Sequence, residues 1–159
     1  MNTFIIAEAG VNHNGDIDTA IKLVDCAVSA GADAVKFQTF KADLLATPYA
    51  EKANYQKQAA QVDIPESQFD MLKKLELTHL MHTTLFDYCS SCNIEFMSTA
   101  FDISSLEYLC SLGIARIKIP SGEITNLPLL ESISQKILQE EVIEGEDLKT
   151  LLAESKMPA

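Results

Sequence analysis

Glycine and proline are scarce in this chain of 159 residues, which contains 6 Gly and 5 Pro. Together with a hydrophobic content of 47%, this scarcity argues against a disordered chain and predicts one domain with a packed core. No run of about 18 apolar residues occurs, so the sequence predicts no membrane span. The first residues lack the basic start and long apolar run of a signal peptide, and we expect a cytoplasmic protein.

Basic residues are also few, since 12 Lys and Arg stand against 23 Asp and Glu, giving a net charge of −11. A chain this acidic is not expected to bind nucleic acid non-specifically. An anionic substrate would therefore need lysines placed locally. Neither a Gly-rich phosphate loop nor a dinucleotide-binding fingerprint is present.

The four cysteines give little evidence of chemistry. Cys26 and Cys110 fall on apolar helical positions, and we predict that both are small core residues. Cys89 and Cys92 form one C-x-x-C pair with no second pair downstream, which is a weak signal for a metal or redox site.

Two histidines lie on a stretch that the pattern predicts to be helical. His79 and His82 are spaced i, i+3, a spacing that can ligate a metal in principle. No acidic residue accompanies them on that face, so we interpret both as surface residues.

Short apolar runs alternate with amphipathic stretches along the chain, which predicts a series of βα units. Capping residues (Asp16 or Asp18, Thr78, Asp102) and terminating glycines (Gly31, Gly113) mark the predicted helices. The predicted strands are residues 4–9, 34–39, 94–99 and 114–119. This rhythm predicts an α/β fold of the TIM-barrel type with about four of eight (β/α) units, a half-barrel with a helical C-terminal tail.

Two segments depart from the rhythm. Residues 40–63 have no clean period and are predicted to form a long surface excursion. A fourth helix is predicted to start at Asn126, and after Gln135 the pattern breaks. We therefore divide the chain into residues 1–135, the N-terminal half of a barrel, and residues 136–159, a helical acidic tail.

Polar residues gather where the predicted strands end, the place where barrel enzymes carry catalytic groups. Lysines with hydroxyls suit phosphate or carboxylate, and paired carboxylates suit proton transfer or binding of sugar hydroxyls. The pattern predicts a site for a small anionic substrate in which Lys36 and Lys118 face a common cavity. Alternatively, Lys118 reaches the surface and Glu123 merely begins a helix. The candidates are Glu8, Lys36, Gln38, Ser98, Thr99, Asp102, Lys118, Ser121 and Glu123.

Several motifs, in the same order along the chain, resemble the sialic acid synthase family. They include IAEAGVNHNG at residues 6–15, GADAVKFQTF at 31–40, FMSTAFD at 96–102 and KIPSGEITNLP at 118–128. Enzymes of this family make N-acetylneuraminate or the related bacterial legionaminate. The resemblance implies condensation of phosphoenolpyruvate with an N-acylated amino sugar, N-acetylmannosamine or a bacterial analogue, in its open-chain aldehyde form, with release of phosphate.

The resemblance also implies roles for single residues. Positions that hold the phosphate and carboxylate of phosphoenolpyruvate are matched by Lys36, Thr99, Lys118 and Ser121. Positions around the sugar are matched by Gln38 and by two carboxylates that would orient it and shuttle protons, Glu8 and Glu123. Asn12 and His13 belong to the first motif, and we expect them to shape its loop.

In the family a divalent metal, manganese or magnesium, polarises the aldehyde oxygen. The histidines that carry this metal lie in the second half of the family's barrel, so we assign no metal ligand to this chain. The family's C-terminal antifreeze-like domain has no counterpart in this sequence either.

Two functions from different classes stay open. The first is a synthase of this family. The second is a non-catalytic remnant that acts as a binding or oligomerising module, because an open half-barrel leaves strand edges and an apolar face uncovered. Apolar area on that face or beneath the helices comes from the isoleucines of residues 114–119 and from Val35, Phe37 and Phe96. For the same reason we expect the chain alone to be catalytically silent, and either homo-oligomeric, covered by its tail or aggregation-prone. A relative that makes an eight-carbon sugar acid would fit the lysines but not the Asn-His-Asn-Gly loop.

Overall fold

The computed structural model describes residues 3–47 and 67–140. The chain divides into two compact units, Met1–Ile124 and Thr125–Ala159. None of the helices in the described ranges combines the length and the apolar character that crossing a membrane requires.

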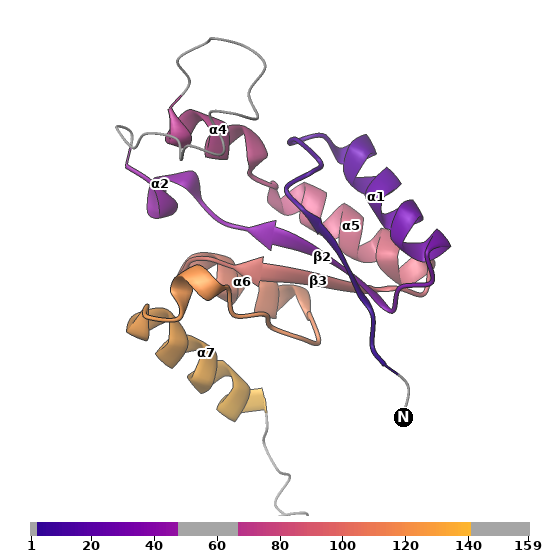
Figure 1. The fold of residues 1–159 in the computed structure, drawn as a ribbon. Helices are drawn as coiled ribbons and strands as arrows, with labels where there is room; N and C mark the ends of the chain where they lie inside the picture. Colours follow the sequence, from indigo (N-terminus) through magenta and orange to yellow (C-terminus); the bar gives the residue numbers. More distant parts are fainter. Residues whose placement is uncertain (1–2, 48–66, 141–159) are drawn as a thin grey trace, which may run out of the picture. The chain divides into compact units, whose positions relative to one another are not determined.

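The first unit is built on a parallel sheet of three strands in the order β1-β2-β3 (Figure 1). The strands are β1 (Ile6–Gly10), β2 (Ala34–Thr39) and β3 (Glu95–Ala100). The predicted bounds of the second strand are confirmed, and those of the third are shifted by one residue.

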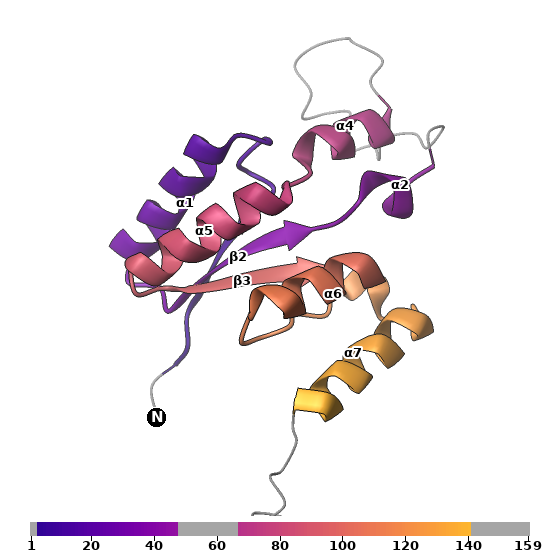
Figure 2. The ribbon, with the colours of Figure 1, turned by 180° about the vertical axis from the view of Figure 1, so that it is seen from behind.

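Helices α1 (Ile17–Ser29), α5 (His79–Ser91) and α6 (Ile103–Leu112) follow the three strands, and α1 and α5 lie side by side (Figures 1 and 2). Each begins at a side-chain cap in which a carboxylate or hydroxyl oxygen accepts a backbone N–H, as predicted. The caps are Asp16, Thr78 and Asp102. The predicted stop of α6 is confirmed, because Gly113 adopts a left-handed conformation with φ of 86°.

Strand residues alternate between the two faces of the sheet, and the aromatic residues identify the face that the helices cover. Phe37 stacks on Phe96 with ring centroids 5.7 Å apart, and Phe86 of α5 meets Phe96 edge-on at 6.0 Å. We call this the helix face. Val35 shares it with Phe37, so the apolar area of these residues lies beneath the helices and not on the barrel-interior side.

The opposite face, here called the inner face, carries polar residues instead. Register pairs Glu8 with Lys36, Lys36 with Met97, and Gln38 with Thr99, and the paired residues share this face. The alternation along β2 therefore places Val35 and Phe37 in the hydrophobic core and Lys36 and Gln38 on the inner face.

Two short helices flank the long excursion after β2. They are α2 (Ala42–Leu45) and α4 (Gln68–Leu75). The Lys73 ammonium lies 3.1 Å from carboxylate oxygens of both Asp43 and Glu76, and the Ala42 N–H donates to Glu76 Oε1 at 2.8 Å. These contacts join the two ends of the excursion. Most of the excursion, residues 48–66, lies outside the described part of the chain.

The predicted fourth strand is wrong in extent. Between residues 114 and 119 the chain makes a single parallel bridge, from Ile117 to Ser98. In the described residues no strand pairs with its other side, and Pro120, which has no N–H, ends the segment. The Arg116 side chain forms an ion pair with Glu95, and its Cζ lies 4.4 Å from the ring centroid of Phe4. A 3-10 turn, η1 (Ser121–Glu123), follows.

The prediction that Cys26 is a core residue is also wrong, because Cys26 is exposed. The buried residues of α1 are Ala20, Val24 and Ala27. Two residues beyond Val24 correspond to a rotation of about 200° around the helix, which places Cys26 on the solvent side. Cys110 is half-buried.

The second unit begins with α7 (Leu127–Glu140). The predicted start at Asn126 is confirmed, since its Oδ1 accepts the N–H of Leu129 at 3.3 Å. The predicted division of the chain at residue 135 stays a prediction, and the tail from residue 141 lies outside the described residues.

Candidate active site

A buried lysine and a carboxylate meet on the inner face. Lys36 is 8% exposed, and its ammonium forms an ion pair with Glu8 of the neighbouring strand. The side chain of Glu8 is 55% exposed, so water reaches the carboxylate more easily than the ammonium. A buried cation needs an anionic partner. Here the partner is a solvent-accessible group that an incoming anion could displace.

Gln38 joins this pair over Gly10. A Cβ added at Gly10 would lie 3.4 Å from Glu8 Oε1 and 3.6 Å from Gln38 Nε2. The carboxylate and the amide therefore converge above this residue, where the backbone has a φ of +55°. Glycine suits the position because it adopts positive φ without strain.

Thr99 provides a hydroxyl without a partner. It is 2% exposed, and its Oγ1 has no hydrogen-bond partner within the described part of the chain. The register places Thr99 beside Gln38 on the inner face. Because buried hydroxyls are almost always hydrogen-bonded in proteins, an unpartnered hydroxyl on the same face as a buried lysine points to a ligand or a water molecule.

Three other predicted site residues lie on the segment that follows α6. Lys118 and Ser121 are exposed, and Glu123 is half-buried. The bridge at Ile117 attaches this segment to β3 one residue before Lys118. The convergence of Lys118 with Lys36 on a common cavity stays a prediction.

Two further candidates belong elsewhere. Ser98 lies on the helix face, opposite to Thr99. Asp102 is the cap of α6: its carboxylate accepts the N–H of Ser105 at 2.7 Å and the hydroxyl of Ser104 at 2.6 Å. Burial by itself would raise the pKa of Asp102, but these hydrogen bonds and one from the Lys41 N–H outweigh it and lower the pKa.

His13 is fully buried in the first loop. Its Nδ1 accepts the N–H of Gly15 at 3.0 Å, which agrees with the expected role in shaping the loop. Burial lowers the pKa of His13, so the ring is neutral at pH 7.

The prediction that His82 is a surface residue is wrong. His82 is buried on the helix face, and its Nδ1 donates to the Thr78 carbonyl oxygen at 2.9 Å. A neutral ring then accepts at Nε2, so the Thr39 hydroxyl donates to it at 2.7 Å and accepts in turn from the Ser98 hydroxyl, also at 2.7 Å. The spacing of His82, Leu85 and Cys89 is that of one buried helical stripe, a signal that sequence reasoning missed.

We expect His82 to make the fold sensitive to mild acid. Burial lowers its pKa from 6.5 to about 4, although the hydrogen bond to the Thr78 carbonyl opposes this shift; nearby basic side chains add to the lowering. Since the unfolded chain binds this proton more readily, the stabilisation is complete above pH 6.5 and is lost as the pH falls towards 4. Between pH 7 and pH 5 the free energy of unfolding should drop by about 2 kcal/mol.

Urea unfolding of the wild type and of His82→Gln at the two pH values measures this effect. The drop should be smaller in the variant, which retains only the contribution of His13. Equal drops in the two proteins would contradict the assignment to His82.

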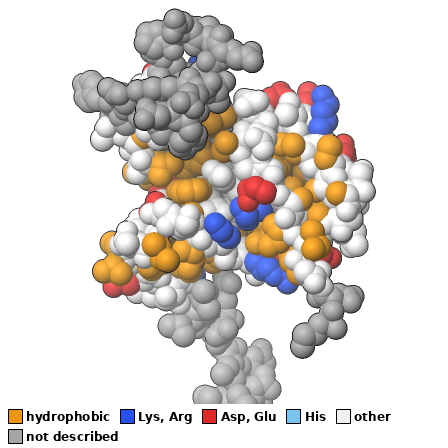
Figure 3. Space-filling model, in the orientation of Figure 1, with side chains coloured by type: hydrophobic (Ala, Val, Ile, Leu, Met, Phe, Trp, Pro, Cys, Tyr) orange, Lys and Arg blue, Asp and Glu red, His pale blue; other side chains and the backbone are white. Residues whose placement is uncertain are grey.

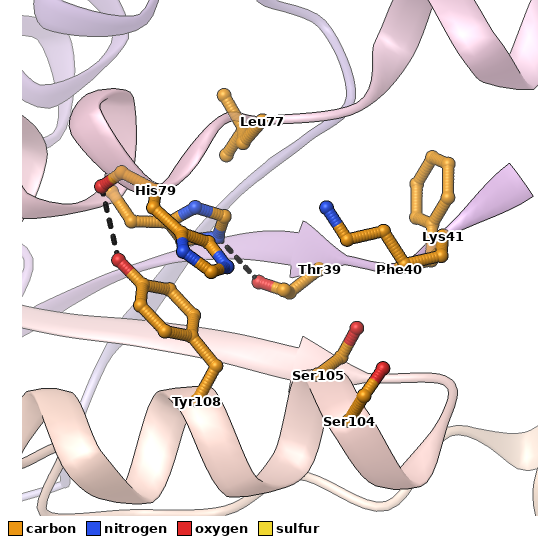
Figure 4. Close-up of a pocket in the computed structure, with 9 residues that line it drawn as sticks. Thr39, Phe40, Lys41, Leu77, His79, Ser104, Ser105 and Tyr108 are labelled. Atoms are coloured by element: carbon orange, nitrogen blue, oxygen red, sulfur yellow. Dashed lines mark hydrogen bonds between the residues drawn. The ribbon is translucent and has the colours of Figure 1, made fainter.

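A separate cavity of about 200 Å³ lies on the helix face, at the end of β2 that carries Thr39 (Figure 4). His79, which is exposed as predicted, stacks on Tyr108 there with ring centroids 3.9 Å apart. The hydroxyls of Tyr108, Ser104 and Ser105 already donate to protein oxygens, and Lys41 is the lysine among the lining residues. These three hydroxyls therefore offer no free donor to an anion in this cavity, whereas the inner face combines a lysine ammonium with the unpartnered Thr99 hydroxyl.

Basic side chains are concentrated locally despite the acidic composition. In Figure 3, basic side chains lie beside an acidic one near the middle of the face shown, among hydrophobic side chains. The inner-face cluster of Glu8, Lys36, Gln38 and Thr99 can therefore bind a small anion through the ammonium and the hydroxyl, next to a carboxylate and an amide.

Solved structures share this arrangement of strands and helices. The N-acetylneuraminic acid (sialic acid) synthetase of Leptospira borgpetersenii, determined in complex with citrate, aligns with a TM-score of 0.71 and 31% identity over 86% of this chain and 42% of that one. The spore coat polysaccharide biosynthesis protein SpsE of Bacillus subtilis aligns with a TM-score of 0.60 and 40% identity over 82% of this chain and 32% of that one. The predicted α/β fold of the TIM-barrel type is confirmed.

Sequence relatives agree. The chain is 56% identical over 140 residues to N,N'-diacetyllegionaminic acid synthase of Legionella pneumophila, which covers 87% of this chain and 38% of the relative. Human N-acetylneuraminate-9-phosphate synthase is 32% identical over 139 residues, covering 84% and 36%. The chain thus spans well under half the length of these relatives. The NeuB family matches residues 23–144, and this chain belongs to that family.

Proposed function

We propose that this chain carries the phosphoenolpyruvate-binding part of a synthase that condenses phosphoenolpyruvate with an N-acylated amino sugar to form a nonulosonic, sialic-type acid. The observation that carries the proposal is that the buried Lys36 and the buried, unpartnered hydroxyl of Thr99 lie on the same face of the sheet, on neighbouring strands. Relatives named as N,N'-diacetyllegionaminic acid and N-acetylneuraminate-9-phosphate synthases support it.

Anion binding falls to lysines and hydroxyls in this proposal. Lys36 and Thr99 bind the phosphate or carboxylate of phosphoenolpyruvate, with Lys118 and Ser121 approaching from the segment attached at Ile117. Binding of the anion replaces Glu8 as the partner of Lys36, which frees the Glu8 carboxylate for the second substrate.

The sugar is held by Glu8, Gln38 and Glu123. In the reaction the methylene carbon of phosphoenolpyruvate forms a bond to the aldehyde carbon of the open-chain sugar. Water adds to the carbon that carries the phosphate, the bond from that carbon to the ester oxygen breaks, and the carbon becomes a ketone as phosphate leaves. The two protons of the water go to the aldehyde oxygen and to the departing phosphate. Carboxylates beside the aldehyde suit the proton transfer.

A divalent metal of the family would need ligands that the described residues do not supply. Within residues 3–47 and 67–140, no three His, Cys, Asp or Glu side chains are grouped so that they could hold a metal ion. The described residues therefore do not fit a complete metal site.

A second function, association through the edge of the sheet, is favoured by one observation. Phe4, Ile5 and Ile6 at β1 are exposed large hydrophobic residues. An edge of this kind can pair with another chain. A purely associating module would bind no phosphoenolpyruvate.

Calorimetric titration of phosphoenolpyruvate into the purified chain separates the two functions. We expect saturable binding that inorganic phosphate weakens by competition. Heat no greater than dilution, together with a concentration-dependent oligomer, would favour the associating module. Phosphate release in the presence of N-acetylmannosamine or its diacetylated bacterial analogue and Mn²⁺ then tests for catalysis.

A further inference from the structure

Three buried side chains on the helix face lie directly behind the proposed anion site. His82 of α5, Thr39 of β2 and Ser98 of β3 form a continuous chain of hydrogen bonds of 2.7 Å each. All three are buried, and the Thr78 carbonyl at one end fixes the direction of every donor. The network is thus completely ordered from the helix to the third strand.

The two strand residues of the network, Thr39 and Ser98, are each covalently next to a residue of the inner face. Thr39 follows Gln38, and Ser98 precedes Thr99, the residue that the register pairs with Gln38. The backbone of Ser98 also bridges to Ile117, which precedes Lys118. Ser98 therefore connects three elements that carry proposed ligands of the anion.

The position of the Thr99 hydroxyl depends on how firmly the end of its strand is held. Its Oγ1 makes no hydrogen bond in the described residues, so only backbone position and packing determine where it points. Just beyond the strands, the Lys41 N–H donates to the Asp102 carboxylate at 3.1 Å and Phe40 meets Phe101 edge-on. Within the strands, the ends are joined by backbone hydrogen bonds, which tolerate small displacements at the end of a ladder. A side-chain network across the strand ends restricts such displacements.

We propose that His82 is a positioning residue: through Thr39 and Ser98 it holds the ends of β2 and β3 together, and so sets the geometry of Gln38 and Thr99 on the opposite face. This inference rests on the proposed function for its consequence in binding. A site that loosens by about 1 Å loses much of its binding or rate even when the protein stays folded.

The test uses the full chain and its affinity for phosphoenolpyruvate, measured under conditions in which every variant is folded by circular dichroism. Thr39→Val removes the central hydroxyl at constant shape and should raise the Kd about 10-fold. Thr39→Ser, which restores the hydroxyl, should return the Kd to within about twofold of the wild type. Thr83→Val is the matched control, because its hydroxyl bonds only to the His79 carbonyl of the same helix.

A role in stability alone would lower the unfolding free energy of Thr39→Val but leave the Kd of the folded protein unchanged, and that result would overturn the inference. Ser98→Ala gives the same test if Thr39→Val does not fold. If the wild type itself binds no phosphoenolpyruvate, the proposed function fails. Crystal structures of the free wild type and Thr39→Val then decide the positioning role, since Thr99 Oγ1 should move by about 0.5 Å or more. An unchanged position overturns it.

Discussion

Replacing Lys36 by Met should weaken the binding of phosphoenolpyruvate by about 2–5 kcal/mol, the loss expected when a desolvated anion loses its charged partner. This corresponds to roughly a 30-fold to 4,000-fold increase in Kd. Lys36 is buried and its counter-ion, Glu8, is accessible to solvent. Met retains the length and the apolar stem of the side chain, so the substitution removes little besides the charge.

Lys41→Met is the matched control. Lys41 is a half-buried lysine five positions after Lys36, but it lines the separate cavity on the helix face at the end of β2. We expect the Kd of the Lys41→Met variant for phosphoenolpyruvate to remain within about threefold of the wild type, as is typical when the removed charge does not contact the ligand. Equal losses in the two variants would indicate a general effect of net charge and not a site at Lys36.

Gly15→Ala should destabilise the first unit by at least about 3 kcal/mol, from backbone strain together with a steric clash. Gly15 has a φ of +74°, and an added Cβ would lie 2.2 Å from the carbonyl oxygen of Lys74. The clash is with backbone at the end of α4, which cannot rotate out of the way. The loop that contains His13 therefore packs so closely against α4 that only glycine fits at position 15.

Gly31→Ala separates the two causes. Gly31 has nearly the same φ, +72°, and nothing lies within 4 Å of an added Cβ. Its substitution should therefore cost only the strain of positive φ, about 1–2 kcal/mol. Denaturant unfolding measures both variants. If the two substitutions cost the same, the close approach to Lys74 does not limit the loop.

Local signals predicted the parts of the fold that local interactions determine. The helix caps at Asp16, Thr78 and Asp102 need only a suitable side chain three residues before an N–H, and they were readable from the sequence. Alternation along β2 placed Lys36 and Gln38 together on one face. The fourth strand failed because pairing depends on neighbours distant in sequence, and apolar alternation in residues 114–119 does not reveal whether they are present.

The candidate site could be predicted only in part, because its geometry also depends on contacts between residues that are distant in sequence. Its residue types were visible at the strand ends, but the ion pair between Glu8 and Lys36 joins residues 28 positions apart and follows from the register of β1 on β2. The burial of His82 was missed because a histidine is compatible with either environment. Its hydrogen bond to Thr39, 43 positions away, explains the burial only once the strands are assembled.

A crystal structure of this chain grown with phosphoenolpyruvate would show directly where the anion binds. We expect the ligand on the inner face, with a phosphate or carboxylate oxygen within hydrogen-bonding distance of Lys36 Nζ and Thr99 Oγ1, and with the Glu8 carboxylate displaced from Lys36. Phosphoenolpyruvate bound in the cavity beside Lys41 and Tyr108, with the ion pair between Glu8 and Lys36 intact, would contradict this expectation.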